Sequence, residues 1–179
     1  AMDAAWRHWD SIAKPLRSLG KLEKAVVQMA GIQGSSQVDI GKKALLVLCA
    51  DNGVVEEKVT QTGQEVTAQV AENFLQEKAT AGILCRKTGA DIFPVDIGIY
   101  RDTSIRNCKI AFGTKNMTKG PAMTREQAPQ GLETGIRLAE EKRREGYRIL
   151  ATGEMGIGNT TTSSAMASVF LGRPAEELT

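Results

Sequence analysis

An unbroken apolar run places the strongest constraint on how this chain folds. Residues 44–50, with the sequence ALLVLCA, are apolar without any alternation. An alternating strand buries one face, whereas a short continuous run is typical of a strand that is covered on both faces. The run stops abruptly at Asp51, Asn52 and Gly53. The pattern therefore predicts a central strand in a sheet with further layers on both sides.

Strand and helix patterns alternate along the rest of the chain. Further strands are expected at 90–100, from Lys109 for a few residues, and at 147–153. Apolar residues at spacings of three and four predict helices at 3–30, 66–76, 80–89, 124–146 and 160–172. Strands that alternate with helices favour an α/β layered fold with a mostly parallel sheet.

Several residues mark the expected ends of these elements. Thr124 and Gln127 form a capping box at the start of the fourth helix. Gly89 and Gly172 are expected to end the helices that precede them. Pro94 weakens the prediction of a strand at 90–100, because proline cannot donate a hydrogen bond to a neighbouring strand.

Composition and charge exclude several classes of protein. The chain has 179 residues, of which 41% are hydrophobic and 25% charged, as in soluble globular proteins. The net charge of +2 is too small and too evenly spread to indicate binding to nucleic acid or to an anionic membrane. No apolar run approaches the ~18 residues that a membrane-spanning helix needs. Ala1 before Met2 is typical of a cleaved expression tag, and no signal peptide is visible, so a cytoplasmic protein is expected.

Few residues in the chain suit metal or histidine chemistry. His8 is the only histidine, which argues against a zinc site built on histidines and against a Ser-His-Asp mechanism. Cys49, Cys85 and Cys108 are scattered in apolar surroundings and are expected to be buried free thiols. We therefore expect chemistry based on carboxylates, backbone amides and small polar groups, without a metal or another cofactor.

The stretch from Gly153 to Thr162, GEMGIGNTTT, carries the strongest functional signal. Ligands of open α/β sheets bind outside the carboxyl ends of the strands, and this stretch follows an expected strand. Glycines let backbone amides approach a ligand, and the start of the following helix favours phosphate. The stretch is neither a Walker loop nor a clean GxGxxG motif, so a tight turn with threonine capping remains an alternative. Glu154 fits either a solvated turn or a contact to ribose hydroxyls or a reacting base.

Six sequence blocks together resemble one enzyme family. They are KPLRSLGKLE, LLVLCADNGV, EVTAQVAENF, DIGI, GPAMTREQA and GEMGIGNTTTSSAMASVFLG, and they occur in the family's order from Lys14 to Gly172. The family is nicotinate-nucleotide–dimethylbenzimidazole phosphoribosyltransferase. The resemblance implies transfer of the 5-phosphoribosyl group of nicotinate mononucleotide to 5,6-dimethylbenzimidazole, giving α-ribazole 5′-phosphate and nicotinate for the lower ligand of cobalamin. It also implies a homodimer without a metal.

The resemblance assigns roles to individual residues. It implies a phosphoribosyl site at Glu154 and at the amides of residues 156–161. The resemblance also implies that the segment around the second predicted helix forms the wall of the base pocket. An exposed helix face is the alternative. The expected substrate-binding residues are Glu154, Gly156, Ile157, Gly158, Asn159, Thr160, Thr161, Thr62, Gln69 and Asn73. Leu16, Arg17 and Asn52 depart from the family's usual residues, which bears on the choice of aromatic acceptor.

The resemblance also sets an expected domain plan. It implies a three-layer Rossmann-like domain at 37–179 and an N-terminal helical segment at 1–36 that belongs to a small second domain. The blocks cover only about the first half of the family's length, and the final RPAEELT is typical of a helix start, so we expect a truncated chain. The family's catalytic glutamate then lies beyond residue 179, and this chain alone is expected to be inactive. A dinucleotide-binding oxidoreductase and a non-catalytic nucleotide-binding module remain alternatives.

Overall fold

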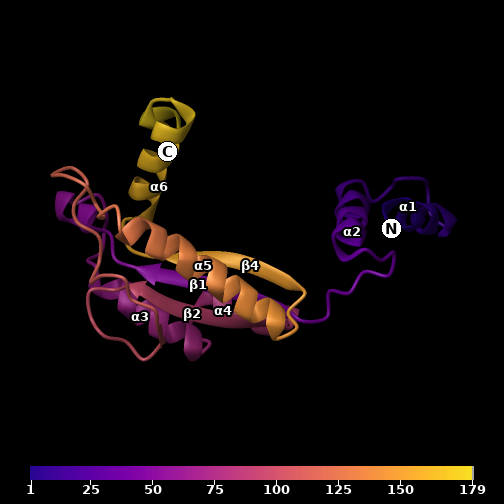
Figure 1. Ribbon diagram of the computed structural model, residues 1–179, viewed down its shortest axis with the longest axis horizontal. Coiled ribbons are helices and arrows are strands. Elements are labelled where there is room, and N and C mark those ends of the chain that lie inside the picture. Colours follow the sequence, from indigo (N-terminus) through magenta and orange to yellow (C-terminus); the bar gives the residue numbers. More distant parts are fainter. Residues whose placement is uncertain (179) are drawn as a thin grey trace. The chain divides into compact units, whose positions relative to one another are not determined.

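The computed structural model describes residues 1–178 and divides the chain into two compact units. The first unit spans residues 1–41 and the second begins at Lys42 (Figure 1). The expected assignment of residues 1–36 to a small domain and of 37–179 to a phosphoribosyl-binding domain stays a prediction.

Two helices form the first unit, where one continuous helix at 3–30 was expected. They are α1 (Met2–Ser11) and α2 (Lys21–Gln33). Pro15 and Gly20 lie between them, and both Arg17 and Gly20 have a positive φ, which ends helical hydrogen bonding. Ala5, Val27 and Ala30 form the buried core between the helices.

A buried ion pair stabilises the turn between α1 and α2. Lys14 Nζ lies 2.7 Å from Glu23 Oε1, and the N–H of Leu19 donates to the same oxygen at 3.2 Å. The side chain of Glu23 is fully buried. The ion pair with Lys14 lowers the pKa of Glu23 below its ordinary value, so the carboxylate stays charged in the interior.

A four-stranded parallel sheet forms the second unit, in the order β3-β2-β1-β4. In β1, Leu46 pairs with Phe93 of β2 on one side and with Thr152 of β4 on the other. The strands are β1 (Lys43–Ala50), β2 (Ala90–Gly98), β3 (Arg106–Asn107) and β4 (Ile149–Met155). The expected α/β class and parallel sheet are thereby confirmed.

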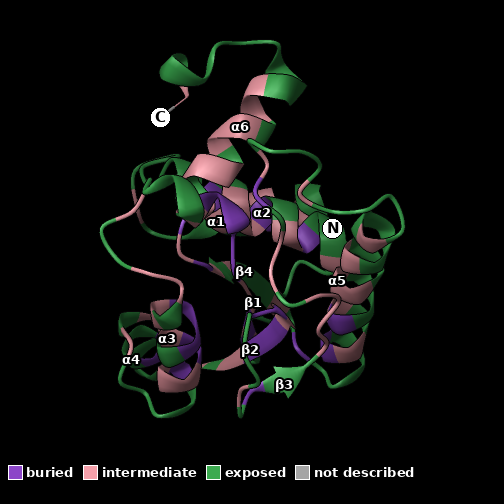
Figure 2. Ribbon diagram, turned by 90° about the vertical axis from the view of Figure 1, so that its left-hand side faces the viewer, coloured by how far each residue is buried: buried purple, intermediate pink, exposed green. Residues whose placement is uncertain are grey.

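Helices cover both faces of this sheet, as the apolar run in β1 predicted (Figure 2). On one face, Val47 and Cys49 of β1 pack with Ala68, Ala71 and Phe74 of α3. On the other face, Leu46 packs with Leu138 of α5. The remaining elements are α3 (Glu65–Leu75), α4 (Thr80–Thr88), α5 (Gln127–Arg144), α6 (Asn159–Leu171) and the short 3-10 turns η1 (Gly53–Glu57) and η2 (Ala175–Glu177).

The expected helix ends agree with the structure. Gln127 and Thr124 exchange side-chain to backbone hydrogen bonds of 2.8 and 3.2 Å, which confirms the capping box. Gly89 and Gly172 adopt the left-handed conformation directly after α4 and α6. Pro94 lies inside β2 at a point where β3 has not yet begun to pair, so the missing amide is tolerated.

The short strand expected from Lys109 is wrong, because pairing with β2 occurs at Arg106–Asn107 instead. Lys109 turns inward, with Nζ 3.0 Å from Asp96 Oδ2 and 2.9 Å from the carbonyl oxygen of Arg101. A buried cation in this position satisfies Asp96 and folds the chain away from an extended course. An ion pair between a strand and the segment after β3 leaves no periodic trace in the sequence.

Three further features bear on the expected classes. The cysteines are free thiols, with Cys49 and Cys85 buried and Cys108 half-buried. Among residues 1–178, no helix is long and apolar enough to cross a membrane. The same residues hold no group of histidine, cysteine and carboxylate side chains arranged for a metal ion.

Candidate active site at the carboxyl edge of the sheet

The polar ends of β1, β2 and β4 meet at one edge of the sheet, because all three strands are parallel. The N–H of Asp51 donates to the carbonyl oxygen of Gly98 at 2.9 Å. The carbonyl of Asp51 in turn accepts from the N–H of Thr114 at 3.0 Å. Asn52, which follows β1, also contacts Ile157, which follows β4. The stretches after β1, β2 and β4 therefore form one polar region, which carries the candidate site.

Residues 153–158 comprise the end of β4 and the turn from it into α6, and we call them the glycine loop. A Cβ atom at Gly156 would lie 2.2 Å from the carbonyl oxygen of Ala50 and 2.8 Å from Asn52 Nδ2. Gly158 has a φ of +85°, a conformation that favours glycine. Two of the three glycines are thus required by the close packing and sharp turn of the loop, whether or not a ligand binds there.

The amides of the glycine loop differ in what they contact. The N–H of Ile157 donates to Thr67 Oγ1 at 3.0 Å, and the N–H of Asn159 donates to the carbonyl oxygen of Gly156 at 3.0 Å. Within the described part of the chain, the N–H groups of Thr160 and Thr161 have no acceptor, as is usual in the first turn of a helix. These two amides, at the positive end of the α6 dipole, are donors available to an anion.

Glu154 lies at the end of β4 and is exposed beside the start of α6. The side-chain amide of Asn159 donates to its carboxylate. Partial burial of the carboxyl group raises the pKa of Glu154, and the hydrogen bond from Asn159 opposes that shift. The strand extends two residues beyond its expected end and includes Glu154. The structure thus brings Glu154 and Asn159 into direct contact, two of the expected site residues.

Thr62, Gln69 and Asn73 lie in or before α3. Thr62 and Gln69 are exposed, and Asn73 is half-buried. In the described residues, none of their side chains forms a hydrogen bond with the glycine loop, and the helix reaches that loop through Thr67 instead. Their expected place in a base pocket stays a prediction.

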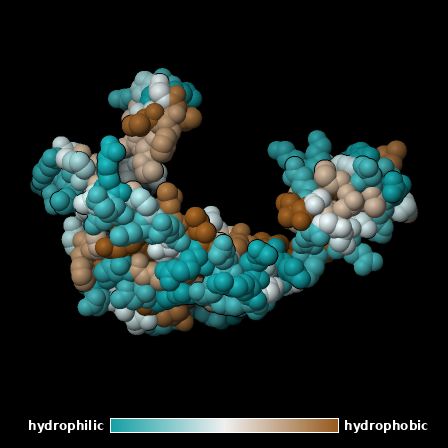
Figure 3. All heavy atoms as spheres, viewed as in Figure 1, coloured by the Kyte–Doolittle hydropathy of each residue, from teal (hydrophilic) through white to brown (hydrophobic). Residues whose placement is uncertain are grey.

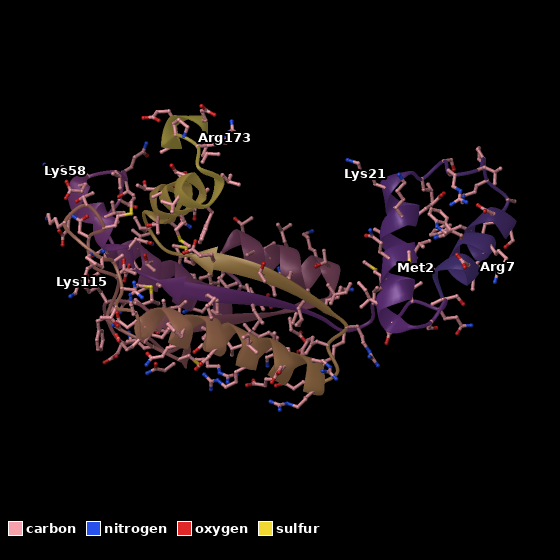
Figure 4. All side chains as sticks on the ribbon, turned by 45° about the horizontal axis from the view of Figure 1, so that its top comes forward. Met2, Arg7, Lys21, Lys58, Lys115 and Arg173 are labelled. Carbon is pink, nitrogen blue, oxygen red and sulfur yellow. The ribbon has the colours of Figure 1, made fainter. Side chains whose placement is uncertain are left out.

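Two cavities open at this edge of the sheet. One, of about 510 Å³, is mostly apolar and lies between strand ends, α5 and α6, with Ala50, Ile97, Leu132 and Phe170 in its lining. The other, of about 670 Å³, is lined by Tyr100 and by three cations, Lys115, Lys119 and Arg125. Lys119 is paired with Glu56 at 2.8 Å. Figure 4 labels Lys115 at the loop-rich end of the sheet.

Comparison with known proteins identifies the family. A family model described as phosphoribosyltransferase matches residues 1–179. The chain belongs to this family. The membership expected from the six sequence blocks is therefore confirmed.

Named relatives of this phosphoribosyltransferase chain agree with the family model. Nicotinate-nucleotide–dimethylbenzimidazole phosphoribosyltransferase from Clostridium tetani is 49% identical over 169 residues, which are 93% of this chain and 47% of that protein. The protein of that name from Acetivibrio thermocellus is 45% identical over 180 residues, with 99% and 51% covered. A crystal structure of CobT from Thermus thermophilus matches with a TM-score of 0.90 and 36% identity, covering 97% of this chain and 53% of that chain. The chain spans about half the length of the curated relatives it matches.

Sequence reasoning missed the two side chains that hold the glycine loop in this family member. Thr67 is fully buried on α3 among apolar neighbours, and Asn52 follows β1. Asn52 Nδ2 donates to the carbonyl oxygen of Ile157 at 3.2 Å, and its Oδ1 accepts from the hydroxyl of Thr162 at 2.9 Å. A polar residue on an otherwise apolar helix face is the signal that could have revealed Thr67.

Asp51 is a buried carboxylate beneath these contacts. Its side chain is 1% exposed, and Oδ2 accepts from the N–H of Tyr100 at 2.8 Å. Burial raises the pKa of Asp51, whereas the hydrogen bond from the N–H of Tyr100 and the nearby hydroxyl of Thr67 oppose that shift. Its Oδ1 is one of the few buried side-chain oxygens in the described chain that lack a hydrogen bond of good geometry.

Proposed function

We propose that the protein to which this chain belongs transfers the 5-phosphoribosyl group of nicotinate mononucleotide to 5,6-dimethylbenzimidazole. The products are α-ribazole 5′-phosphate and nicotinate, in the assembly of the lower ligand of cobalamin. The observation that carries the proposal is the family match over residues 1–179, which includes the glycine loop at the end of β4. Relatives at 49% and 45% identity bear the name of this activity.

The phosphate of the donor substrate is assigned to the start of α6. The unpaired N–H groups of Thr160 and Thr161 are oriented by the helix, and they meet an anion at the positive end of its dipole. Glu154 accepts hydrogen bonds from ribose hydroxyls, with Asn159 holding its carboxylate. In this role the amides of Gly156 to Thr161 line the phosphoribosyl site.

The reaction itself exchanges one C–N bond for another. A ring nitrogen of the base attacks the anomeric carbon of the ribose, and the bond to nicotinate breaks. The attacking azole must also lose its N–H proton, which requires an acceptor. We assign that acceptor to a glutamate beyond residue 179, and we assign the wall of the base site to Thr62, Gln69 and Asn73.

The working form of the protein is proposed to be a cytoplasmic homodimer. The proposed substrates are small molecules, and the net charge of +2 supports a protein that binds neither nucleic acid nor an anionic membrane. No metal or other cofactor enters the proposed reaction.

Nicotinate release tests the proposed function. Nicotinate mononucleotide is incubated with the product of the whole reading frame and, separately, with this chain, with and without 5,6-dimethylbenzimidazole. Chromatography is expected to show nicotinate and α-ribazole 5′-phosphate in equal amounts only when the base and the whole protein are present. A whole protein that releases no nicotinate but binds NAD would contradict the proposal and favour a dinucleotide-binding module.

A further inference from the structure

Both backbone polar groups of Ile157 are held by side chains from other elements. Thr67 of α3 accepts from its N–H at 3.0 Å, and Asn52 at the end of β1 donates to its carbonyl oxygen at 3.2 Å. The contacts span 90 and 105 residues of sequence. No other described residue of the glycine loop is bound in this way at both groups.

Each of the two side chains is itself fixed in place. Asn52 Oδ1 accepts from the Thr162 hydroxyl at 2.9 Å, and the Asn52 carbonyl oxygen accepts from Gln64 Nε2 at 2.9 Å. Asn52 therefore joins the end of β1 to the first turn of α6 as well as to the loop. Its side chain is 8% exposed, so water competes little for these hydrogen bonds.

Thr67 is fixed by its burial. The residue is fully buried on α3, so water does not compete for its hydroxyl. A threonine hydroxyl oxygen carries two lone pairs, and one of them accepts the hydrogen bond from the N–H of Ile157.

We propose that Thr67 and Asn52 are positioning residues that hold the glycine loop in its anion-binding conformation. A loop with glycines at 153, 156 and 158 has many conformations open to it, and ordering it upon binding would cost affinity. Because the N–H and the carbonyl of Ile157 are both hydrogen bonded, the N–H groups of Thr160 and Thr161 already have their binding orientation before the ligand arrives. We call the two contacts from Thr67 and Asn52 to Ile157 the clamp. The identity of the anion as a ribose phosphate rests on the proposed function, whereas the clamp does not.

Amide hydrogen exchange on this chain without ligand tests the clamp. Thr67→Val keeps the shape of the side chain and removes the acceptor, so exchange at Ile157 should speed up about tenfold or more. Thr67→Ser should restore slow exchange. Thr88→Val removes a hydroxyl from the exposed end of α4 and should leave Ile157 unchanged. If the Ile157 amide exchanged as slowly in Thr67→Val as in the wild type, the proposal would be overturned.

Binding of ribose 5-phosphate, measured by calorimetry, tests the consequence. Asn52→Asp keeps the oxygen that accepts from Thr162 but cannot donate to Ile157. The variant therefore removes the contact of Asn52 to the loop while keeping its contact to α6. Thr67→Val and Asn52→Asp should each weaken binding about 5- to 20-fold, with Thr67→Ser close to wild type. Lowered unfolding midpoints with unchanged affinity would reduce both residues to structural roles and overturn the proposal. A wild-type chain that binds no ribose 5-phosphate, but shows the expected exchange pattern, would support the clamp and contradict the proposed phosphate site.

Discussion

Glu154 is exposed and its pKa is raised. Its substitution can therefore be expected to affect activity without affecting folding. Exposed side chains contribute little to folding, so Glu154→Ala should change the free energy of unfolding by less than about 0.5 kcal/mol. In the whole protein the same change should lower kcat/KM about 10- to 100-fold, because the proposed charge-assisted hydrogen bond to the ribose would be lost.

The matched control for Glu154 is Glu133→Ala, which changes an exposed glutamate on α5. It should alter neither rate nor stability, as judged by steady-state kinetics and urea unfolding. Equal activity of Glu154→Ala and wild type would remove Glu154 from the proposed ribose contact.

Asp51 gives the stability of the fold a predictable dependence on pH. Burial raises its pKa above the ordinary value of 3.8, so the folded chain binds the proton more tightly than the unfolded chain. Its contribution is therefore complete below that ordinary value and is lost as the pH rises through the raised pKa.

Asp51→Asn removes this titration. Relative to the variant, the wild type should lose stability as the pH rises from the ordinary value of 3.8 through the raised pKa, by about 1.4 kcal/mol for each unit that separates the folded and unfolded pKa values. Urea unfolding of both chains across this range measures the difference. A constant difference at every pH would mean that Asp51 titrates alike in both states.

At the scale of elements, glycine is required in the glycine loop, where a side chain has no room, but not in α5, where one does. A Cβ at Gly156 would lie 2.2 Å from a backbone oxygen of β1, whereas a Cβ at Gly135, inside α5, would have nothing within 4 Å. Gly156→Ala should therefore lower the free energy of unfolding by about 1–3 kcal/mol or more through overpacking. Gly135→Ala should raise it by about 0.5–1 kcal/mol, because alanine favours a helix. A Gly156→Ala variant as stable as the wild type in urea unfolding would contradict the close approach of the glycine loop to β1.

The sequence was informative about elements wherever a local pattern decided the structure. The apolar run in β1, the capping box at Thr124 and the glycine after α4 each depend on neighbours a few residues away. The break between α1 and α2 was missed because apolar spacing continues across Pro15. The clamp of Thr67 and Asn52 on Ile157 joins residues 90 and 105 positions apart, and pairings at such distances leave no periodic signal in one sequence.

At the scale of the whole molecule, α6 stands out for the surface that it exposes. None of its residues is fully buried, and Val169, Phe170 and Leu171 are 81%, 79% and 62% exposed (Figure 3). Adjacent β4 is also mostly exposed. Apolar surface of this extent is typical of an interaction surface. The chain spans about half the length of its relatives, so its activity has to be judged in the whole protein.

The central claim is that the start of α6 binds the phosphate of nicotinate mononucleotide. An amide NMR titration of this chain with that nucleotide tests it most directly. We predict saturable shifts at Thr160 and Thr161, whose N–H groups are unpaired, and smaller ones at Ile157, whose N–H is held by Thr67. Shifts confined to the basic cavity around Lys115 and Arg125, with none at the start of α6, would contradict the claim.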